Sequence, residues 1–233
     1  MQDDNHQFRI TALYVCFTLP AHMYTLRESD NVNVSALPVG IVPWHILQPW
    51  VDMYYAEVAG WTNPQAEAGM NVAIQQQVQQ LLYDQGYGDG VSELTGGFDL
   101  KNNQRHVLSL THTVYSFAGG AHGMTVERAL TFDSRTGRAY TLTELFAPGV
   151  DFIPRLNAII QAQLEERGWF EHILGPYEGI TTEQPFYVAD KTLVIYFDLY
   201  ELMPYVYGIP YFPISVYAIM DLINEDGPLG WIL

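Results

Sequence analysis

The stretch that decides the fold covers residues 61–132 and reads WTNPQAEAGM NVAIQQQVQQ LLYDQGYGDG VSELTGGFDL KNNQRHVLSL THTVYSFAGG AHGMTVERAL TF. Asn63 and Pro64 are typical of a helix start. The apolar residues that follow recur at helical spacing and predict one buried helix face: Met70, Ile74, Val78, Leu81 and Leu82. Three predicted strands come next, at 91–101, 105–117 and 124–132. We expect the Asn102-Asn103 pair to form the first turn between them.

The rest of the chain mixes strands and helices without the regular alternation of a doubly wound sheet. Residues 8–19, 22–26 and 52–58 are typical of strands, whereas 28–50 indicate an irregular crossing. A second helix should run over 151–167 with Asp151 as its cap, and a hairpin should join 186–188 to 192–197. A short helix is expected at 215–223. These elements predict an α+β fold of mixed, largely antiparallel sheets packed by helices, in two closely associated subdomains with a boundary near 118–120.

The net charge of the chain limits the kinds of partner that it is expected to bind. The 233 residues include 10 Lys and Arg against 26 Asp and Glu, for a net charge of −16. Because nucleic-acid binding relies on cations that displace phosphate counterions, we expect no nucleic-acid partner. No apolar run of 18 or more residues occurs, so no membrane insertion is expected. The acidity favours either solubility alone or a basic partner. From Thr192 onward there are no cations, and the acids are Asp198, Glu201, Asp221, Glu225 and Asp226.

Familiar catalytic and metal-binding patterns are missing from the sequence. Cys16 is the single cysteine, which excludes an internal disulfide and a thiolate metal cage, and its apolar surroundings favour a buried, inert thiol. His106 and His112 would lie on one strand about 20 Å apart, too far to share an ion. No nucleophile elbow, phosphate loop or dinucleotide fingerprint is present. We therefore expect no metal and no cofactor, and an enzyme is less favoured than a binding protein.

Residues 115–123, YSFAGGAHG, form the first candidate site. Gly119 and Gly120 permit a left-handed backbone or a close approach to a ligand. His122 follows them and could contact a ligand directly. The alternative is a tight crossover in which His122 bonds the backbone.

Residues 196–213, YFDLYELMPYVYGIPYFP, form the second candidate site. The three prolines prevent regular pairing along the whole segment, so part of it should be a rigid loop. Tyrosine gives a large contact area at low entropic cost and is favoured at interfaces, although the rings could equally fill the core. The candidate ligand-binding residues here are Tyr200, Glu201, Pro204, Tyr205, Tyr207 and Tyr211.

The order of motifs resembles one bacterial family. YSFAGGAHG, LTFDSRTGRAYTLTELF, an amphipathic helix, QPFYVADKTLVIYFDLYEL and PYVYGIPYFPI occur in the order seen in PdaC/RsiV-like proteins of the cell envelope. That C-terminal domain is shared by a lysozyme-sensing anti-sigma factor and a peptidoglycan deacetylase. Residues 54–78 are similar to the smaller domain that precedes it. The match covers residues 115–219.

The resemblance implies a small PdaC-like α+β subdomain over 49–118 and an RsiV-like subdomain over 119–233, and it leaves residues 1–48 as an unassigned N-terminal extension. It implies an extracytoplasmic binding or sensing role toward a cell-wall component, such as a peptidoglycan fragment, or a basic protein such as lysozyme. This location requires a signal or anchor in the natural protein, and otherwise the protein is cytoplasmic. Deacetylase activity does not carry over, because no matching catalytic segment is present. The alternative is a hydrolase-like enzyme that uses His122 with Asp198 or Glu201.

Overall fold

The computed structural model describes residues 38–90 and 92–233 and confirms the α+β prediction. A six-stranded sheet has the order β1-β2-β3-β4-β5-β6, and a second sheet has the order β7-β8-β9. All pairs are antiparallel except β2 with β3. The larger sheet comprises β1 (Ile41–Gln48), β2 (Val51–Val58), β3 (Glu93–Gln104), β4 (Val107–Phe117), β5 (Met124–Asp133) and β6 (Arg138–Ala139). The smaller comprises β7 (Phe186–Ala189), β8 (Thr192–Tyr196) and β9 (Tyr211–Ser215).

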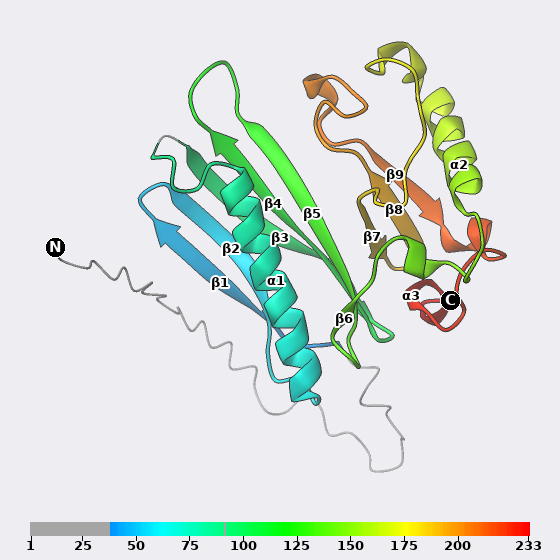
Figure 1. Cartoon of the computed structure of the whole chain (residues 1–233), viewed down its shortest axis with the longest axis horizontal. Coiled ribbons are helices and arrows are strands. Elements are labelled where there is room, and N and C mark those ends of the chain that lie inside the picture. Colours follow the sequence, from blue (N-terminus) through cyan, green and yellow to red (C-terminus); the bar gives the residue numbers. More distant parts are fainter. Residues whose placement is uncertain (1–37, 91) are drawn as a thin grey trace, which may run out of the picture.

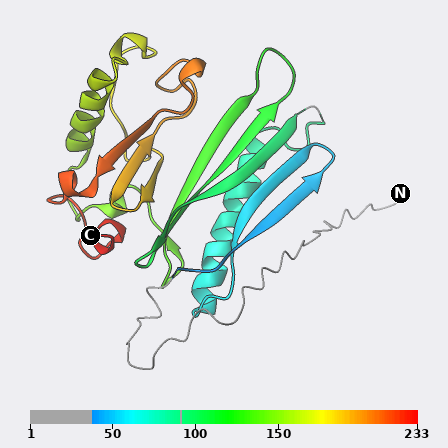
Figure 2. The same cartoon turned by 180° about the vertical axis from the view of Figure 1, so that it is seen from behind.

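The elements form four layers (Figures 1 and 2). Helix α1 (Pro64–Asp84) covers one face of the larger sheet, and the smaller sheet faces the opposite side of it. Helix α2 (Ile153–Glu166) covers the outer face of the smaller sheet, and α3 (Pro228–Trp231) lies near the C-terminus. One apolar core lies between α1 and the larger sheet, and another between α2 and the smaller sheet. Between the two sheets the contacts are largely polar and aromatic.

Helix α1 begins as predicted. The Asn63 side chain accepts hydrogen bonds from the N–H groups of Gln65 and Ala66, and Pro64 stands in the first turn. All five of the predicted core residues are buried. The hairpin across Asp190 is also confirmed, with Asp190 at a φ of 48°.

The first turn of the central hairpin lies three residues later than predicted. β3 continues through Gln104, which pairs with Val107, so the turn is Arg105-His106, with φ values of 51° and 66°. A register shift between Leu100 and Asn102 inserts one extra residue in β3, and Asn102 and Asn103 continue the ladder by pairing with Ser109 and Leu108. The prediction that His106 and His112 share a strand is therefore wrong, because His106 lies in the turn.

Other predicted boundaries also change. Part of the expected irregular crossing is strand β1, because residues 41–48 pair with β2 along their whole length. Asp151 does not cap α2, which begins at Ile153 with Phe152 at the cap position. The expected helix at 215–223 is instead the end of β9 followed by a 3-10 turn, Val216–Ile219, because Ser215 pairs with Thr192. The strands predicted at 8–19 and 22–26, and Cys16, lie outside the described residues.

Candidate functional site

The two candidate segments identified from the sequence meet in space. His122, in the loop between β4 and β5, stacks on Tyr205, with ring centroids 4.1 Å apart and an interplanar angle of 21°. The Nε2 atom of His122 lies 3.3 Å from the hydroxyl of Tyr200. We call the group His122, Tyr200, Tyr205 and Val206 the tyrosine surface. Val206, which we did not single out from the sequence, is 84% exposed at its edge.

The loop geometry fixes the orientation of His122. Its Nδ1 lies 3.0 Å from the carbonyl oxygen of Gly123. A carbonyl only accepts, so Nδ1 is the donor of this bond, and in a neutral ring Nε2 then accepts from Tyr200. The N–H of Gly123 donates to the hydroxyl of Tyr115, and a side chain at Gly123 would collide with that same tyrosine. The ring therefore presents one face to Tyr205 and its Nε2 to Tyr200.

Gly119 and Gly120 form the exposed tip of the loop. Both have positive φ values, 89° and 102°. Tyr200 also has a positive φ, 65°, which is uncommon for a residue with a bulky side chain. This conformation places an aromatic ring that is 45% exposed against His122. Backbone strain of this kind concentrates at functional sites.

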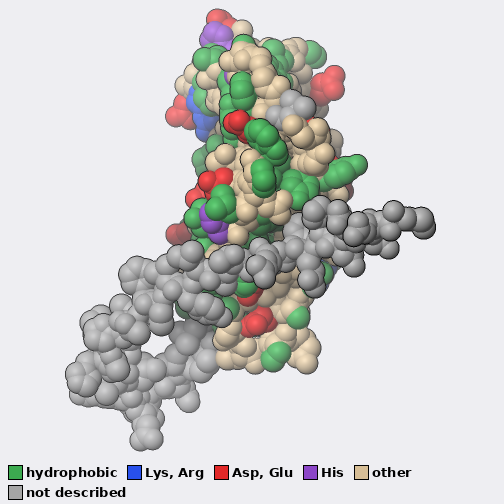
Figure 3. Space-filling model, turned by 90° about the vertical axis from the view of Figure 1, so that its left-hand side faces the viewer, with side chains coloured by type: hydrophobic (Ala, Val, Ile, Leu, Met, Phe, Trp, Pro, Cys, Tyr) green, Lys and Arg blue, Asp and Glu red, His purple; other side chains and the backbone are tan. Residues whose placement is uncertain are grey.

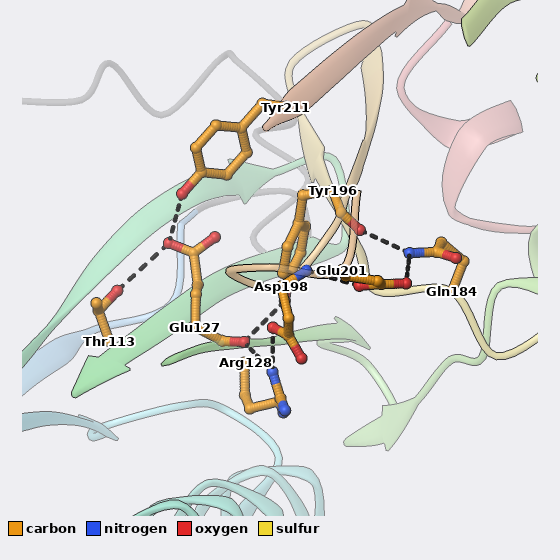
Figure 4. Close-up of polar contacts among 8 residues, drawn as sticks. All are labelled: Thr113, Glu127, Arg128, Gln184, Tyr196, Asp198, Glu201 and Tyr211. Carbon is orange, nitrogen blue, oxygen red and sulfur yellow. Dashed lines mark hydrogen bonds and ion pairs between the residues drawn. The ribbon is translucent and has the colours of Figure 1, made fainter. Parts of the chain in front are cut away.

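A network of polar contacts fixes residues 196–213, the second candidate segment, to the rest of the fold (Figure 4). Arg128, on β5, forms an ion pair with Asp198 at 2.8 Å and also donates to the Glu127 carbonyl. The Glu201 carboxylate accepts from the Asp198 backbone N–H at 2.7 Å and from Gln184 at 3.3 Å. These contacts tie the loop to both sheets. A cavity of about 390 Å³ lies beside them, lined in part by Arg128, Gln184 and Asp198.

Glu127 is a buried carboxyl group between the two sheets. One of its oxygens, Oε2, accepts from Thr113 at 3.3 Å and from Tyr211 at 3.2 Å, whereas Oε1 has no partner among the described residues. Burial raises the pKa of Glu127, and Lys101 opposes this to a smaller extent. Burial also raises the pKa of Tyr211. Sequence reasoning missed Glu127, although a lone acid on a predicted strand was a usable signal.

The remaining predicted residues lie away from the tyrosine surface. Tyr207 packs edge-on against Trp169 and stacks on His172, with both centroid distances 5.7 Å. Tyr211 lies between the sheets with Glu127. Pro204 is half-buried and precedes the 3-10 turn that carries Tyr205. Glu201 is exposed next to the surface, so it can still meet a ligand.

The site does not assemble a hydrolytic triad from the described residues. His122 contacts Tyr200, Tyr205 and a carbonyl, while Asp198 and Glu201 are bonded elsewhere. A His–carboxylate pair occurs instead at His45 and Asp52 in the β1–β2 hairpin. Within residues 38–90 and 92–233 no group of three or more His, Cys, Asp or Glu is placed to hold a metal. None of the helices in this part of the chain is long and apolar enough to cross a membrane.

Comparisons with known proteins show a family match over part of the chain and two similar folds. Residues 143–217 match the family described as Protein of unknown function (DUF3298). The fold is similar to a DUF3298 protein of Pseudomonas aeruginosa PAO1, at 14% identity and a TM-score of 0.62 over 81% of this chain and 94% of that chain. It is also similar to one from Bacteroides fragilis NCTC 9343, at 12% identity and a TM-score of 0.61 over 86% and 98%. The chain therefore has the fold seen in DUF3298 proteins.

A curated relative covers part of the chain. Esterase Rv3036c of Mycobacterium tuberculosis (strain ATCC 25618 / H37Rv) is 31% identical over 88 residues. These residues are 37% of this chain, and the chain spans 39% of the length of that esterase.

Proposed function

We propose that the protein is an extracytoplasmic binding or sensing module of the bacterial cell envelope whose tyrosine surface recognises a basic protein. The observation that carries the proposal is the packed group of His122, Tyr200 and Tyr205, in which His122 and Tyr200 are exposed and which a polar network holds in place. The location rests on the resemblance to PdaC/RsiV-like proteins.

The charge distribution supports a basic partner. Every Lys and Arg among the described residues already has an intramolecular contact: Lys101, Arg105, Arg128, Arg135, Arg138, Arg155, Arg167 and Lys191. The excess of acids is therefore left to attract cations from outside. Asp198 and Asp221 are neutralised by arginines. Glu225 and Asp226 come just before α3, which lies at the end of the smaller sheet away from the orange 3-10 turn that carries Tyr205 (Figure 1). Glu201 is consequently the acid of that set that borders the tyrosine surface.

Tyrosine rings suit this partner for a second reason. The face of an aromatic ring attracts a Lys or Arg side chain. Tyr205 is already fixed by its stack on His122, so little conformational entropy is lost on binding. The partner would place basic side chains over Tyr200 and Tyr205.

Calorimetry with hen lysozyme as the basic probe tests the proposal. We expect binding at low salt that weakens as salt rises, since the screening length falls to about 8 Å at physiological ionic strength. Tyr205→Ala should weaken binding at least tenfold. Tyr83→Ala is the control, because Tyr83 is 72% exposed on α1, outside the tyrosine surface. Absence of binding at low salt, or equal binding by Tyr205→Ala, would refute the proposal. Binding of muropeptides but not lysozyme would replace the basic protein with a cell-wall ligand.

Ester hydrolysis is a second candidate, favoured by the partial match to an esterase. At the tyrosine surface such an enzyme would have to use His122 with Asp198 or Glu201, and both acids are bonded to other groups. Hydrolysis of p-nitrophenyl acetate by the wild type and His122→Ala separates the candidates. A binding module gives equal, near-background rates. A rate that depends on His122 would establish the enzyme.

A further inference from the structure

A second surface lies on the far side of the larger sheet. A groove of about 690 Å³ separates β1 from the C-terminal half of α1. Its apolar lining includes Ile46, Tyr55, Val78 and Leu82, and the helix adds exposed glutamine side chains: Gln75, Gln76, Gln79 and Gln80. This volume falls within the range of ligand-binding pockets.

The groove is nearly uncharged although the chain is strongly acidic. Its lining contains no Asp, Glu, Lys or Arg, and its one ionisable group apart from tyrosines is His45, which pairs with Asp52. Figure 3 looks onto this side of the molecule and shows hydrophobic side chains at the surface, with acidic side chains around them. A ligand for this groove must therefore be uncharged along its bound length, unlike the basic partner of the tyrosine surface.

The strand beside the groove has backbone groups that no other described residue pairs with. β1 is an edge strand of the sheet within the described residues. The bond from Ala59 N–H to the Gly40 carbonyl fixes the phase of the β1–β2 ladder. Since pairing alternates along an antiparallel strand, residues 42, 44, 46 and 48 point their backbone groups at β2, and residues 41, 43, 45 and 47 point theirs outward.

A proline divides this edge into two parts. Pro43 stands at an outward position, where it has no N–H to offer. Its presence blocks strand addition along the first half of β1. The free outward N–H groups of the second half belong to His45 and Leu47, and both residues line the groove. The pairing edge and the groove therefore coincide.

We propose that this groove binds an extended, uncharged peptide segment of a partner protein by strand addition to His45–Gln48. Strand addition supplies affinity through main-chain hydrogen bonds and specificity through alternate side chains. One set of peptide side chains would enter the groove between Ile46 and Val78. The other set would lie along Leu47 and Tyr54, which are 69% and 46% exposed. The groove face is apolar, and on the other face Leu47 and Tyr54 lie beside the His45–Asp52 pair, so the segment should be uncharged and rich in Val, Ile and Thr. At about 3.3 Å per residue, the free half of β1 accommodates roughly four residues.

Fluorescence polarisation on the full chain tests this with a labelled, end-blocked Thr-Val-Thr-Val peptide. Leu47→Pro removes an outward N–H without touching the bonds to β2, and we expect it to weaken binding at least tenfold. Leu47→Ala keeps that N–H and should change binding less than threefold. Gln79→Arg places a long charged side chain on the rim of the groove from an exposed helix position, and it should also abolish binding. This variant tests the proposal independently in case Leu47→Pro folds poorly. The Tyr205→Ala protein should bind the peptide as the wild type does, which separates this site from the tyrosine surface.

Three results would overturn the proposal. One is the absence of saturable binding by the wild type. Another is a loss of binding in Leu47→Ala equal to that in Leu47→Pro, which would assign binding to the side chain alone. The third is self-association of the wild type that Leu47→Pro removes while the peptide fails to bind, which would make a second copy of this chain the occupant.

Discussion

Two buried ionisable side chains on neighbouring strands should make the stability of the fold depend on pH in opposite directions. His112, on β4, has no solvent exposure. Its Nδ1 contacts Gln77 at 2.9 Å, and its Nε2 has no partner among the described residues. Burial lowers the pKa of His112 from 6.5 to about 4. Glu127, on β5, has its pKa raised by burial.

His112 should make the fold sensitive to mild acid. Between pH 6.5 and about 4 the unfolded chain binds a proton at this residue and the folded chain does not, so stability falls as the pH falls. The full effect of this shift is on the order of 3 kcal/mol. Urea denaturation at pH 4, 5, 6 and 7 should show the loss in the wild type and a smaller loss in His112→Gln. An unchanged pH dependence in the variant would show that another group is responsible.

Glu127→Gln is the matched comparison. The raised pKa of Glu127 means that the folded chain holds this proton more tightly, so the wild type loses stability as the pH rises above 4.5 toward the folded pKa. Glutamine removes this second dependence and leaves the His112 effect in place. The variant should therefore become more stable relative to the wild type as the pH rises, with the same decline in acid.

Among the elements, α1 was predicted best because its signals are local. Asn63, Pro64 and the apolar spacing lie within a single segment. Strand β1 was missed because Pro43 and Pro49 favoured an irregular reading. Pro43 breaks no hydrogen bond of the sheet, because it stands at a position where the backbone N–H would point outward. Which positions of β1 point outward depends on how β1 pairs with β2, and composition does not show it. The turn at Arg105-His106 was missed for the same kind of reason, since the extra residue in β3 has no sequence signal.

The candidate site was predicted in its parts but not in its assembly. His122 and Tyr200 were each selected for their residue type and local pattern, yet 78 residues separate them. Their contact depends on how the smaller sheet lies on the larger one. The same packing turns Tyr211 inward onto Glu127 and Tyr207 onto Trp169. Composition alone could not divide the tyrosines into core and surface.

The cap of α1 offers a test of the local argument. Asn63→Ala removes the acceptor for the N–H groups of Gln65 and Ala66, which should lower the free energy of unfolding by about 1 kcal/mol. Asn63→Ser retains a capping oxygen but loses the bond from Nδ2 to the Arg135 carbonyl. We expect serine to recover most of the stability in urea denaturation. Equal losses in both variants would place the contribution in the Arg135 contact instead.

At the scale of the whole molecule, a few polar contacts join two apolar cores. The Ser109 hydroxyl accepts the Val188 N–H at 3.1 Å, and Tyr211 donates to Glu127. Arg105, in the β3–β4 turn, donates to the carbonyl oxygens of Ile232 and Leu233 at 2.8 and 2.9 Å. These bonds link the larger sheet to β7, β9 and the C-terminus. They also fix the distance between the loop that carries His122 and the segment that carries Tyr205, so the tyrosine surface exists only while both cores are docked.

Docking of the two cores should therefore depend strongly on Ser109. Ser109→Ala leaves the buried Val188 N–H without an acceptor, which should cost about 1–3 kcal/mol. Because that bond crosses between the sheets, the variant should also unfold less cooperatively, with a smaller denaturant slope than the wild type. Thr111→Val is the control on the same strand, since the Thr111 hydroxyl is buried without a partner among the described residues and its removal should be neutral or stabilising. Urea unfolding followed by tryptophan fluorescence and by circular dichroism measures both quantities. If Ser109→Ala lowers stability with an unchanged slope and coincident transitions, the cores remain coupled through the Tyr211 and Arg105 contacts.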